Sequence, residues 1–192
     1  MDVIKRLINI NDISVEDYEK YFSLMSDEKK KRLNRFRFEN DRKRSVAGEM
    51  LARQMISEYC SANEGDIVFL PDKFGKPYAK GLKVHFSISH SNDMALCAVG
   101  PSPVGADIEK IREIKDSVIE RVCTEHEIEY VNKQEITHEE RMRRFFEVWT
   151  FKEAYFKYLG TGLSDFKSLD LFSCEKEVES VTKDGYVYCI IK

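Results

Sequence analysis

The sequence lacks the features that mark several large classes of protein. It has no run of about 18 apolar residues that could span a bilayer, and Lys5 and Arg6 interrupt the only apolar stretch near its start. We therefore expect neither membrane insertion nor secretion. The five cysteines are scattered and include no C-x-x-C pair, which argues against a disulfide framework or zinc knuckle and favours the reducing cytoplasm.

The sequence also has little net charge. Its 31 lysines and arginines nearly balance 34 aspartates and glutamates, for a formal charge of -3, so composition indicates neither nucleic acid nor a membrane surface as partner. Apolar residues make up 42% of the 192 positions, and no repeat or flexible linker divides them. These proportions predict one compact folded body.

Hydrophobic periodicity and turn residues predict a mixture of helices and strands. Ser14, Ser26 and Thr124 are expected to cap helices, and the stretch 137–140 is expected to form a capping box for a helix that Gly160 ends. Helices are predicted at 15–22, from 27 onward, and at 40–60, 116–123, 125–132 and 137–159. Strands are predicted at 3–10, 67–70, 84–89, 94–99, 104–109, 168–172, 177–182 and 186–191, with a hairpin turn at 184–185.

A basic segment lies between residues 28 and 44. It holds nine lysines and arginines against three acidic residues, in a chain whose net charge is negative. Such a run is typical of a solvated helix face, and it also suits a site for an anion. The sequence alone leaves both interpretations open.

Three acidic residues occupy defined faces of predicted elements. In the strand 104–109, Asp107 and Glu109 share one face, while apolar residues alternate with them on the other. In the helix 137–159, Glu153 falls within the apolar stripe, where a carboxylate is costly unless it is paired or binds a metal. Alternatively, Asp107 and Glu109 are ordinary surface acids at the end of the strand. Lys157, one turn after Glu153, either lies beside a bound phosphate or forms an ordinary i,i+4 surface pair with Glu153.

The chemistry of these side chains favours a hard divalent cation. Three carboxylates without a histidine or cysteine cluster suit Mg²⁺, which completes its coordination with waters and substrate phosphates. Ser89 and His90, at the end of a predicted strand, add groups that can donate to anionic oxygens. The motifs G-x-S-x-G, G-x-x-x-x-G-K-[ST] and G-x-G-x-x-G are absent, so neither a serine hydrolase nor a common nucleotide loop is supported.

Five short motifs together resemble a known family. They are F-G-K-P at 74–77, F-S-I-S-H-S at 86–91, V-G-A-D-I-E at 104–109, W-T-F-K-E-A-Y-F-K at 149–157 and G-T-G-L-S at 160–164. Each is weak alone, but their order and spacing resemble the 4'-phosphopantetheinyl transferase superfamily, in its surfactin-synthetase-activating (Sfp) type.

The resemblance implies an enzyme that moves the phosphopantetheine arm of coenzyme A to a serine of an acyl, peptidyl or polyketide carrier protein. It implies that Asp107, Glu109 and Glu153 hold Mg²⁺, or Mn²⁺, on the pyrophosphate. The implied catalytic residues are Glu153, as proton acceptor, and Lys157, beside the transferred phosphate. The implied coenzyme A contacts are Lys29, Arg32 and Arg44 on the 3'-phosphate, Gly75, Lys76 and Pro77 at the adenine, and Ser89 and His90 on phosphate oxygens.

The resemblance also implies an α+β fold of two similar halves related by a pseudo-twofold, with coenzyme A in the cleft between them. We expect residues 1–102 to form the first half and 103–192 the second, in a cytoplasmic monomer. Because members of this type usually carry another strand after the last hairpin, we expect the second sheet to be shortened. A non-catalytic coenzyme-A-binding relative and an unrelated Mg²⁺-dependent phosphohydrolase or nuclease are the alternatives.

Overall fold

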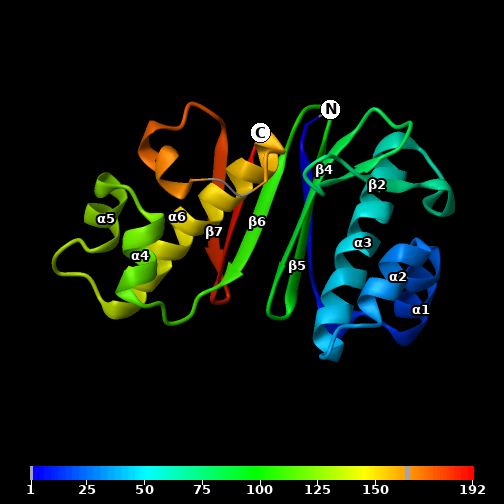
Figure 1. The fold of residues 1–192 in the computed structure, drawn as a ribbon, viewed down its shortest axis with the longest axis horizontal. Coiled ribbons are helices and arrows are strands. Elements are labelled where there is room, and N and C mark those ends of the chain that lie inside the picture. The colour runs from blue at the N-terminus through cyan, green and yellow to red at the C-terminus, as the bar shows by residue number, and fades with distance from the viewer. Residues whose placement is uncertain (1, 163–164) are drawn as a thin grey trace.

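Two antiparallel sheets form the centre of the structure, a computed structural model that describes residues 2–162 and 165–192 (Figure 1). The first contains β1 (Ile4–Asn9), β5 (Met94–Gly100) and β4 (His85–Ser91), in the order β1-β5-β4. The second contains β6 (Gly105–Lys110), β8 (Tyr186–Ile191) and β7 (Val178–Lys183), in the order β6-β8-β7. A separate short ribbon pairs β2 (Phe69–Pro71) with β3 (Pro77–Ala79).

Helices cover the outer face of each sheet. The helices are α1 (Val15–Leu24), α2 (Asp27–Leu33), α3 (Glu39–Cys60), α4 (Asp116–Val122), α5 (Glu125–Val131) and α6 (His138–Leu159). Helix α3 lies on the first sheet with α1 and α2 beside it, and α6 lies on the second with α4 and α5 (Figure 1). This mixture agrees with the predicted α+β class. No helix in the described part of the chain has both the length and the apolar character needed to cross a membrane.

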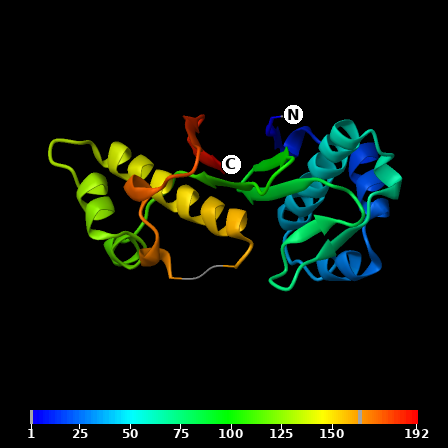
Figure 2. The same ribbon diagram turned by 90° about the horizontal axis from the view of Figure 1, so that it is seen from above.

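The inner faces of the two sheets pack against each other. Leu96 and Ala98 of β5 contact Ala106 and Ile108 of β6 in one buried apolar cluster. Figure 2 shows the C-terminal end of α6 and the β2–β3 ribbon on the side of the molecule away from the two chain termini. Helix α6 packs on the second sheet, and the ribbon contacts the first sheet through β3 and β4. A site between these two segments therefore draws on both parts of the sequence.

Polar side chains set most helix ends where the sequence predicts them. Ser14, Ser26 and Thr124 each accept a backbone N–H at the start of a helix, and Gly160 ends α6 in the left-handed conformation, with φ +65°. The predicted capping box at 137–140 is wrong in part. Thr137 accepts the N–H of residue 140, but the carboxylate of that glutamate pairs with arginines of its own helix instead of returning to the cap.

The predicted strand at 168–172 is also wrong. Short 3-10 helices, Phe166–Ser168 and Leu171–Ser173, occupy this stretch instead. The side chains of Asp165 and Asp170 each accept a backbone N–H two residues further on, which bends the chain locally. The buried carboxylate of Glu127, on α5, accepts the backbone N–H of Leu171, and Lys152 of α6 donates to the carbonyl of Phe166 just before the stretch, so these groups are not free for a sheet ladder.

Strand β6 approaches α6 unusually closely at Gly105. A Cβ atom at this position would lie 1.8 Å from the carbonyl oxygen of Ala154 and 2.7 Å from the backbone nitrogen of Tyr158. Only glycine fits this approach. The contact sets the distance between the acidic residues of β6 and the side chains of α6.

Candidate functional site

Strand β6 carries two carboxylates on the face away from the inter-sheet core. Ala106 and Ile108 are buried between the sheets, whereas Asp107 and Glu109 both act electrostatically on Glu153 of α6. Asp107 is almost fully buried, with 3% of its surface exposed. The predicted alternation of the strand therefore places three acidic side chains in one neighbourhood.

Serines of β4 bind the two strand carboxylates. Ser89 Oγ donates to Asp107 Oδ1 at 2.6 Å, and Ser91 Oγ donates to Glu109 Oε2 at 2.7 Å. The serines are two residues apart on β4, as the acids are on β6, so one face of each strand supplies both contacts. These bonds connect the first sheet to the acidic edge of the second.

Lys157 of α6 completes this polar group. Its Nζ donates to Asp107 Oδ1 at 2.7 Å and to Ser89 Oγ at 3.0 Å. Among the described residues, Lys157 forms no ion pair with Glu153, so the alternative i,i+4 surface pair is not what the structure shows. The cation instead lies where β4, β6 and α6 meet.

Glu153 is half-buried beside this group, and its pKa is raised to about 7. Burial is the largest cause, and the neighbouring carboxylates of Asp107 and Glu109 add to it, while Lys157 opposes it. A carboxyl group with this pKa can accept a proton and release it near neutral pH.

The residues present fit a divalent cation, although they do not form a closed metal site. No three His, Cys, Asp or Glu side chains in residues 2–162 and 165–192 are gathered closely enough to count as one. However, Asp107 Oδ2 is buried and has no hydrogen-bond partner among these residues. An unpartnered carboxylate oxygen beside two further acids is a hard-oxygen donor set, the kind that Mg²⁺ binds together with water and phosphate oxygens.

A pocket of about 340 Å³ adjoins the carboxylates. Glu153 and Lys157 line it from α6, and Phe86 and Ile88 line it from β4. Its full lining is Phe74, Gly75, Lys76, Pro77, Phe86, Ser87, Ile88, Glu153, Phe156, Lys157, Gly160 and Gly162. Four of the five predicted motifs thus contribute to one cavity. Leu163 and Ser164, of the G-T-G-L-S motif, lie outside the described residues.

The loop that carries Gly75 is closed by a residue that sequence reasoning missed. Asp72 Oδ1 accepts the backbone N–H groups of Phe74, at 2.8 Å, and Lys76, at 2.9 Å. Gly75 has φ +87°, in the left-handed region that favours glycine. An aspartate three residues before a glycine in a loop was the available signal, because aspartates often accept N–H groups of the turn that follows them.

Lys76 faces inward from this loop. Its Nζ donates to the carbonyl oxygens of Val104 and Lys157, so it fastens the loop to the start of β6 and the end of α6. The pKa of Lys76 is lowered to about 8, mainly by burial; the charge of Lys157 also lowers it, whereas that of Asp72 opposes the shift. Its ammonium is therefore bound to backbone carbonyls, whereas Gly75 and Pro77 remain exposed on the loop.

His90 and Arg44 meet at the end of β4. The imidazole of His90 keeps solvent access, but partial desolvation lowers its pKa, and the charges of Lys157 and Arg44 lower it further. Arg44 itself donates to the carbonyl oxygen of Asn92 at 2.7 Å and pairs with Asp41. Both cations are already paired with carboxylates, Arg44 with Asp41 and Lys157 with Asp107, and Asp107 opposes their effect on the His90 pKa.

The other predicted basic residues lie on α2. Lys29 Nζ donates to Glu49 Oε2 at 2.7 Å, and Arg32 is exposed. In the described part of the chain, no hydrogen bond or ion pair joins either residue to Arg44 or to the site carboxylates of Asp107, Glu109 and Glu153. The structure thus gathers the acidic and α6 residues into one cluster and leaves Lys29 and Arg32 on a separate element.

A buried ion pair lies directly beside Glu153 in the sequence. Lys152 Nζ and Glu127 Oε2 are 2.6 Å apart, and both side chains are 0% exposed. Lys152 also donates to two backbone carbonyls, and Glu127 accepts two backbone N–H groups. The pair fixes the rotation of α6 about its axis. The sequence signal for the burial of Lys152 was its position on the same helix face as the apolar Phe145 and Val148.

Comparisons with known proteins agree with the motifs. Residues 103–185 match the model of the 4'-phosphopantetheinyl transferase superfamily, and residues 12–102 match that of the 4'-phosphopantetheinyl transferase N-terminal region. The 4'-phosphopantetheinyl transferase Sfp of Bacillus subtilis (strain 168) is 32% identical over 185 residues, which cover 94% of this chain and 81% of the relative.

Two further relatives carry the same name. The 4'-phosphopantetheinyl transferase gsp of Aneurinibacillus migulanus is 35% identical, over 80% of this chain and 63% of the relative. The 4'-phosphopantetheinyl transferase ffp of Bacillus subtilis is 35% identical, over 84% of this chain and 70% of the relative. The chain therefore belongs to the 4'-phosphopantetheinyl transferase superfamily and is a transferase of its Sfp type.

Proposed function

We propose that this protein transfers 4'-phosphopantetheine from coenzyme A to a serine hydroxyl of an apo carrier protein. The products are the holo carrier and adenosine 3',5'-bisphosphate. The observation that carries the proposal is the position of Glu153 and Lys157, which line the pocket from α6 while Asp107 of β6 lies beside them. The names of these relatives supply the group that is transferred.

The pocket suits one end of coenzyme A. Gly75 and Pro77 present exposed loop surface, and Phe74 and Phe86 offer aromatic faces, which supports a place for the adenine. Ser89, His90 and Arg44 lie toward the end of β4, where a hydroxyl, an imidazole and a guanidinium can donate to phosphate oxygens. Lys29 and Arg32 of α2 are assigned to the 3'-phosphate.

Asp107, Glu109 and Glu153 would hold Mg²⁺. Among their oxygens, Oδ2 of Asp107 is buried and has no hydrogen-bond partner among the described residues, so it is available as a ligand. When bound, the cation neutralises charge on the pyrophosphate oxygens. Lys157 already donates to Asp107, and its ammonium is close enough to the pocket to bind an oxygen of the transferred phosphoryl group.

Glu153 acts as the proton acceptor. The serine oxygen forms a bond to the phosphorus, the bond from that phosphorus to the bridging oxygen of the bisphosphate breaks, and the serine proton passes to Glu153. Without a bound cation its pKa is about 7, and a cation would favour the ionised form, so the carboxylate is available as an acceptor near neutral pH.

The proposal includes two similar halves, at residues 1–102 and 103–192, related by a pseudo-twofold. Each half has the chain order strand, long helix, strand, strand: β1, α3, β4 and β5 in the first half, and β6, α6, β7 and β8 in the second. The last strand of each half, β5 or β8, lies in the centre of its sheet. Because both halves belong to one chain, a monomer suffices. We place the reaction in the cytoplasm, with the five cysteines as free thiols.

The proposal is tested by the intact mass of apo acyl, peptidyl and polyketide carrier proteins after incubation with this protein, coenzyme A and Mg²⁺. We expect a gain of one phosphopantetheine that a chelator abolishes. The variant Glu153→Gln serves as the inactive control. No gain on any carrier, with a folded protein that binds coenzyme A, would instead support a non-catalytic coenzyme-A-binding relative.

A further inference from the structure

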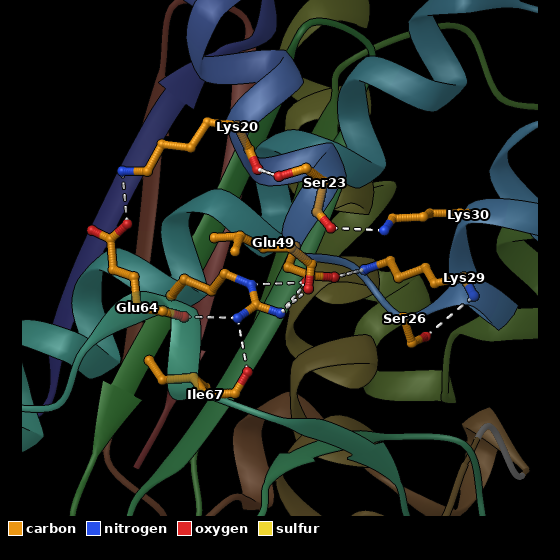
Figure 3. Close-up of polar contacts among 10 residues, drawn as sticks. Lys20, Ser23, Ser26, Lys29, Lys30, Glu49, Glu64 and Ile67 are labelled. Carbon is orange, nitrogen blue, oxygen red and sulfur yellow. Dashed lines mark hydrogen bonds and ion pairs between the residues drawn. The ribbon is translucent and has the colours of Figure 1, made fainter.

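A buried charged group that the proposed reaction does not use lies behind helix α2. Glu49 and Arg53, one turn apart on α3, are each 3% exposed. Arg53 donates to Glu49 Oε1 through Nε, at 2.9 Å, and through Nη2, at 2.7 Å. The second carboxylate oxygen, Oε2, accepts Lys29 Nζ at 2.7 Å (Figure 3).

Arg53 has every donor of its guanidinium occupied. Besides Glu49, it binds the carbonyl oxygens of Leu24, at the end of α1, and of Glu64 and Ile67, before β2. Figure 3 shows the carbonyls of Glu64 and Ile67 and the carboxylate of Glu49 converging on one planar group. Because a guanidinium in this state has no freedom to rotate, the carboxylate of Glu49 is held in one orientation.

Lys29 differs from its two buried partners because it reaches solvent. Its side chain is 26% exposed, and among the described residues its ammonium has one hydrogen-bond partner, Glu49. The remaining two N–H groups are available to a ligand. Arg32 follows three residues later on the same face of α2 and is exposed.

The three charges leave a surplus. Lys29, Glu49 and Arg53 sum to one positive charge, and the only one of the three that reaches solvent is the partly exposed Lys29. Helix α2 itself has a single buried residue, Leu33, so its packing fixes the Lys29 side chain weakly. The bond to Glu49 is therefore what holds the ammonium at a defined point on the surface.

We propose that Glu49, fixed by Arg53, is a positioning residue that orients Lys29 for a terminal phosphate monoester. This inference rests on the proposed function, in which that group is the 3'-phosphate of coenzyme A. Glu49 does not touch the ligand. It determines how strongly the protein distinguishes a ligand that carries this phosphate from one that lacks it.

The test is a direct binding measurement with two probes that differ only in this phosphate. Calorimetric titration gives Kd for adenosine 3',5'-bisphosphate and for adenosine 5'-monophosphate, and their ratio is the preference for the 3'-phosphate. We expect Glu49→Gln and Lys29→Met each to reduce this preference about tenfold, the loss of one charge-assisted hydrogen bond, with little change in the monophosphate Kd.

The double variant separates positioning from direct binding. If Glu49 acts through Lys29, Glu49→Gln causes no further loss of preference in a Lys29→Met protein. Lys30→Met is the matched control, because Lys30 lies on the same helix but donates to the carbonyl of Ser23. It should retain the wild-type preference. Thermal unfolding of each variant checks that it is folded. If Glu49→Gln unfolds, Glu49→Asp, which keeps the buried charge but shortens the side chain that reaches Lys29, replaces it in the same measurements.

Three results would overturn the inference. The wild type could bind both probes equally, Glu49→Gln could weaken the binding of both probes to the same extent, or the effects of Glu49→Gln and Lys29→Met on the preference could be additive. A failed transfer assay would be a different result. If the binding preference and its loss in Glu49→Gln are seen without any transfer to carrier proteins, the positioning role stands and the proposed function fails.

Discussion

Lys157 and Asp107 form an ion pair at 2.7 Å that joins α6 to β6. The carboxylate oxygen that Lys157 does not bind, Asp107 Oδ2, is buried and has no hydrogen-bond partner in the described part of the chain. A buried acceptor without a partner costs free energy, which a bound cation would recover. This relationship leads to the first prediction.

Asp107→Asn should reduce transfer by on the order of 100-fold or more and weaken the dependence on Mg²⁺, because an amide donor replaces an oxygen ligand. The measurement is the rate of carrier modification over a Mg²⁺ titration. Glu58→Gln, which changes a surface carboxylate paired with Arg6, should behave as wild type. An Asp107→Asn protein with unchanged metal dependence would remove Asp107 from the metal site.

The raised pKa of Glu153 predicts a pH-dependent stability in the metal-free protein. The folded pKa is about 7 and the unfolded pKa about 4.5, so the folded state binds the extra proton between these values. The stability that this group contributes is fully present below pH 4.5 and is lost as pH rises through 7. We expect a loss of about 1–2 kcal/mol, discounted for the solvent that reaches this side chain.

Urea unfolding at several pH values, with a chelator present, measures this loss. Glu153→Gln removes the titrating group, so its stability should vary less with pH while its transfer activity is abolished. Added Mg²⁺ should flatten the wild-type curve, because a cation favours the ionised carboxylate. Identical pH profiles for the two proteins would contradict the raised pKa.

Lys152→Met should destabilise the protein by about 3–5 kcal/mol, because it leaves the carboxylate of Glu127 buried without its cation. Denaturant unfolding at neutral pH measures this change. Lys43→Met is the matched control, since Lys43 pairs with the exposed Glu39 on the surface of α3. A Lys152→Met protein as stable as the control would show that the pair does not fix α6.

Gly105→Ala should destabilise the protein by about 1–3 kcal/mol or more, because its Cβ would overlap the backbone of α6. Transfer should fall as well, since β6 would move away from Glu153. Gly65→Ala is the control: the nearest atom to its added Cβ is 4.0 Å away. Equal unfolding free energies for the two variants would refute the close approach of β6 and α6.

Local sequence signals were sufficient for much of the fold. Ser14, Ser26 and Thr124 cap helices as predicted, because a cap needs only a side-chain oxygen and the next turn of backbone. The hairpin at 184–185 follows for the same reason: Asp184 and Gly185 both have positive φ, as their residue types allow. The alternation of β6 likewise predicted that Asp107 and Glu109 share a face.

Contacts between distant segments could not be predicted in this way. The partner of Lys157 is Asp107, 50 residues away, although Glu153 lies one helical turn from it. The stretch 168–172 has the composition of a strand, but Glu127 of α5 accepts the N–H of Leu171 and Asp170 accepts that of Phe172, so these groups do not join a sheet.

The sequence by itself determined most of the helices and strands, although not the stretch 168–172, as well as the faces of β6 and the set of motifs that identify the family. The tertiary structure alone decided the sheet order, the pairing of Lys152 with Glu127 and the charge group of Glu49, Arg53 and Lys29. The physical reason is range: caps and alternation depend on neighbours in the chain, whereas a buried charge takes whichever partner the packed fold brings within hydrogen-bond distance.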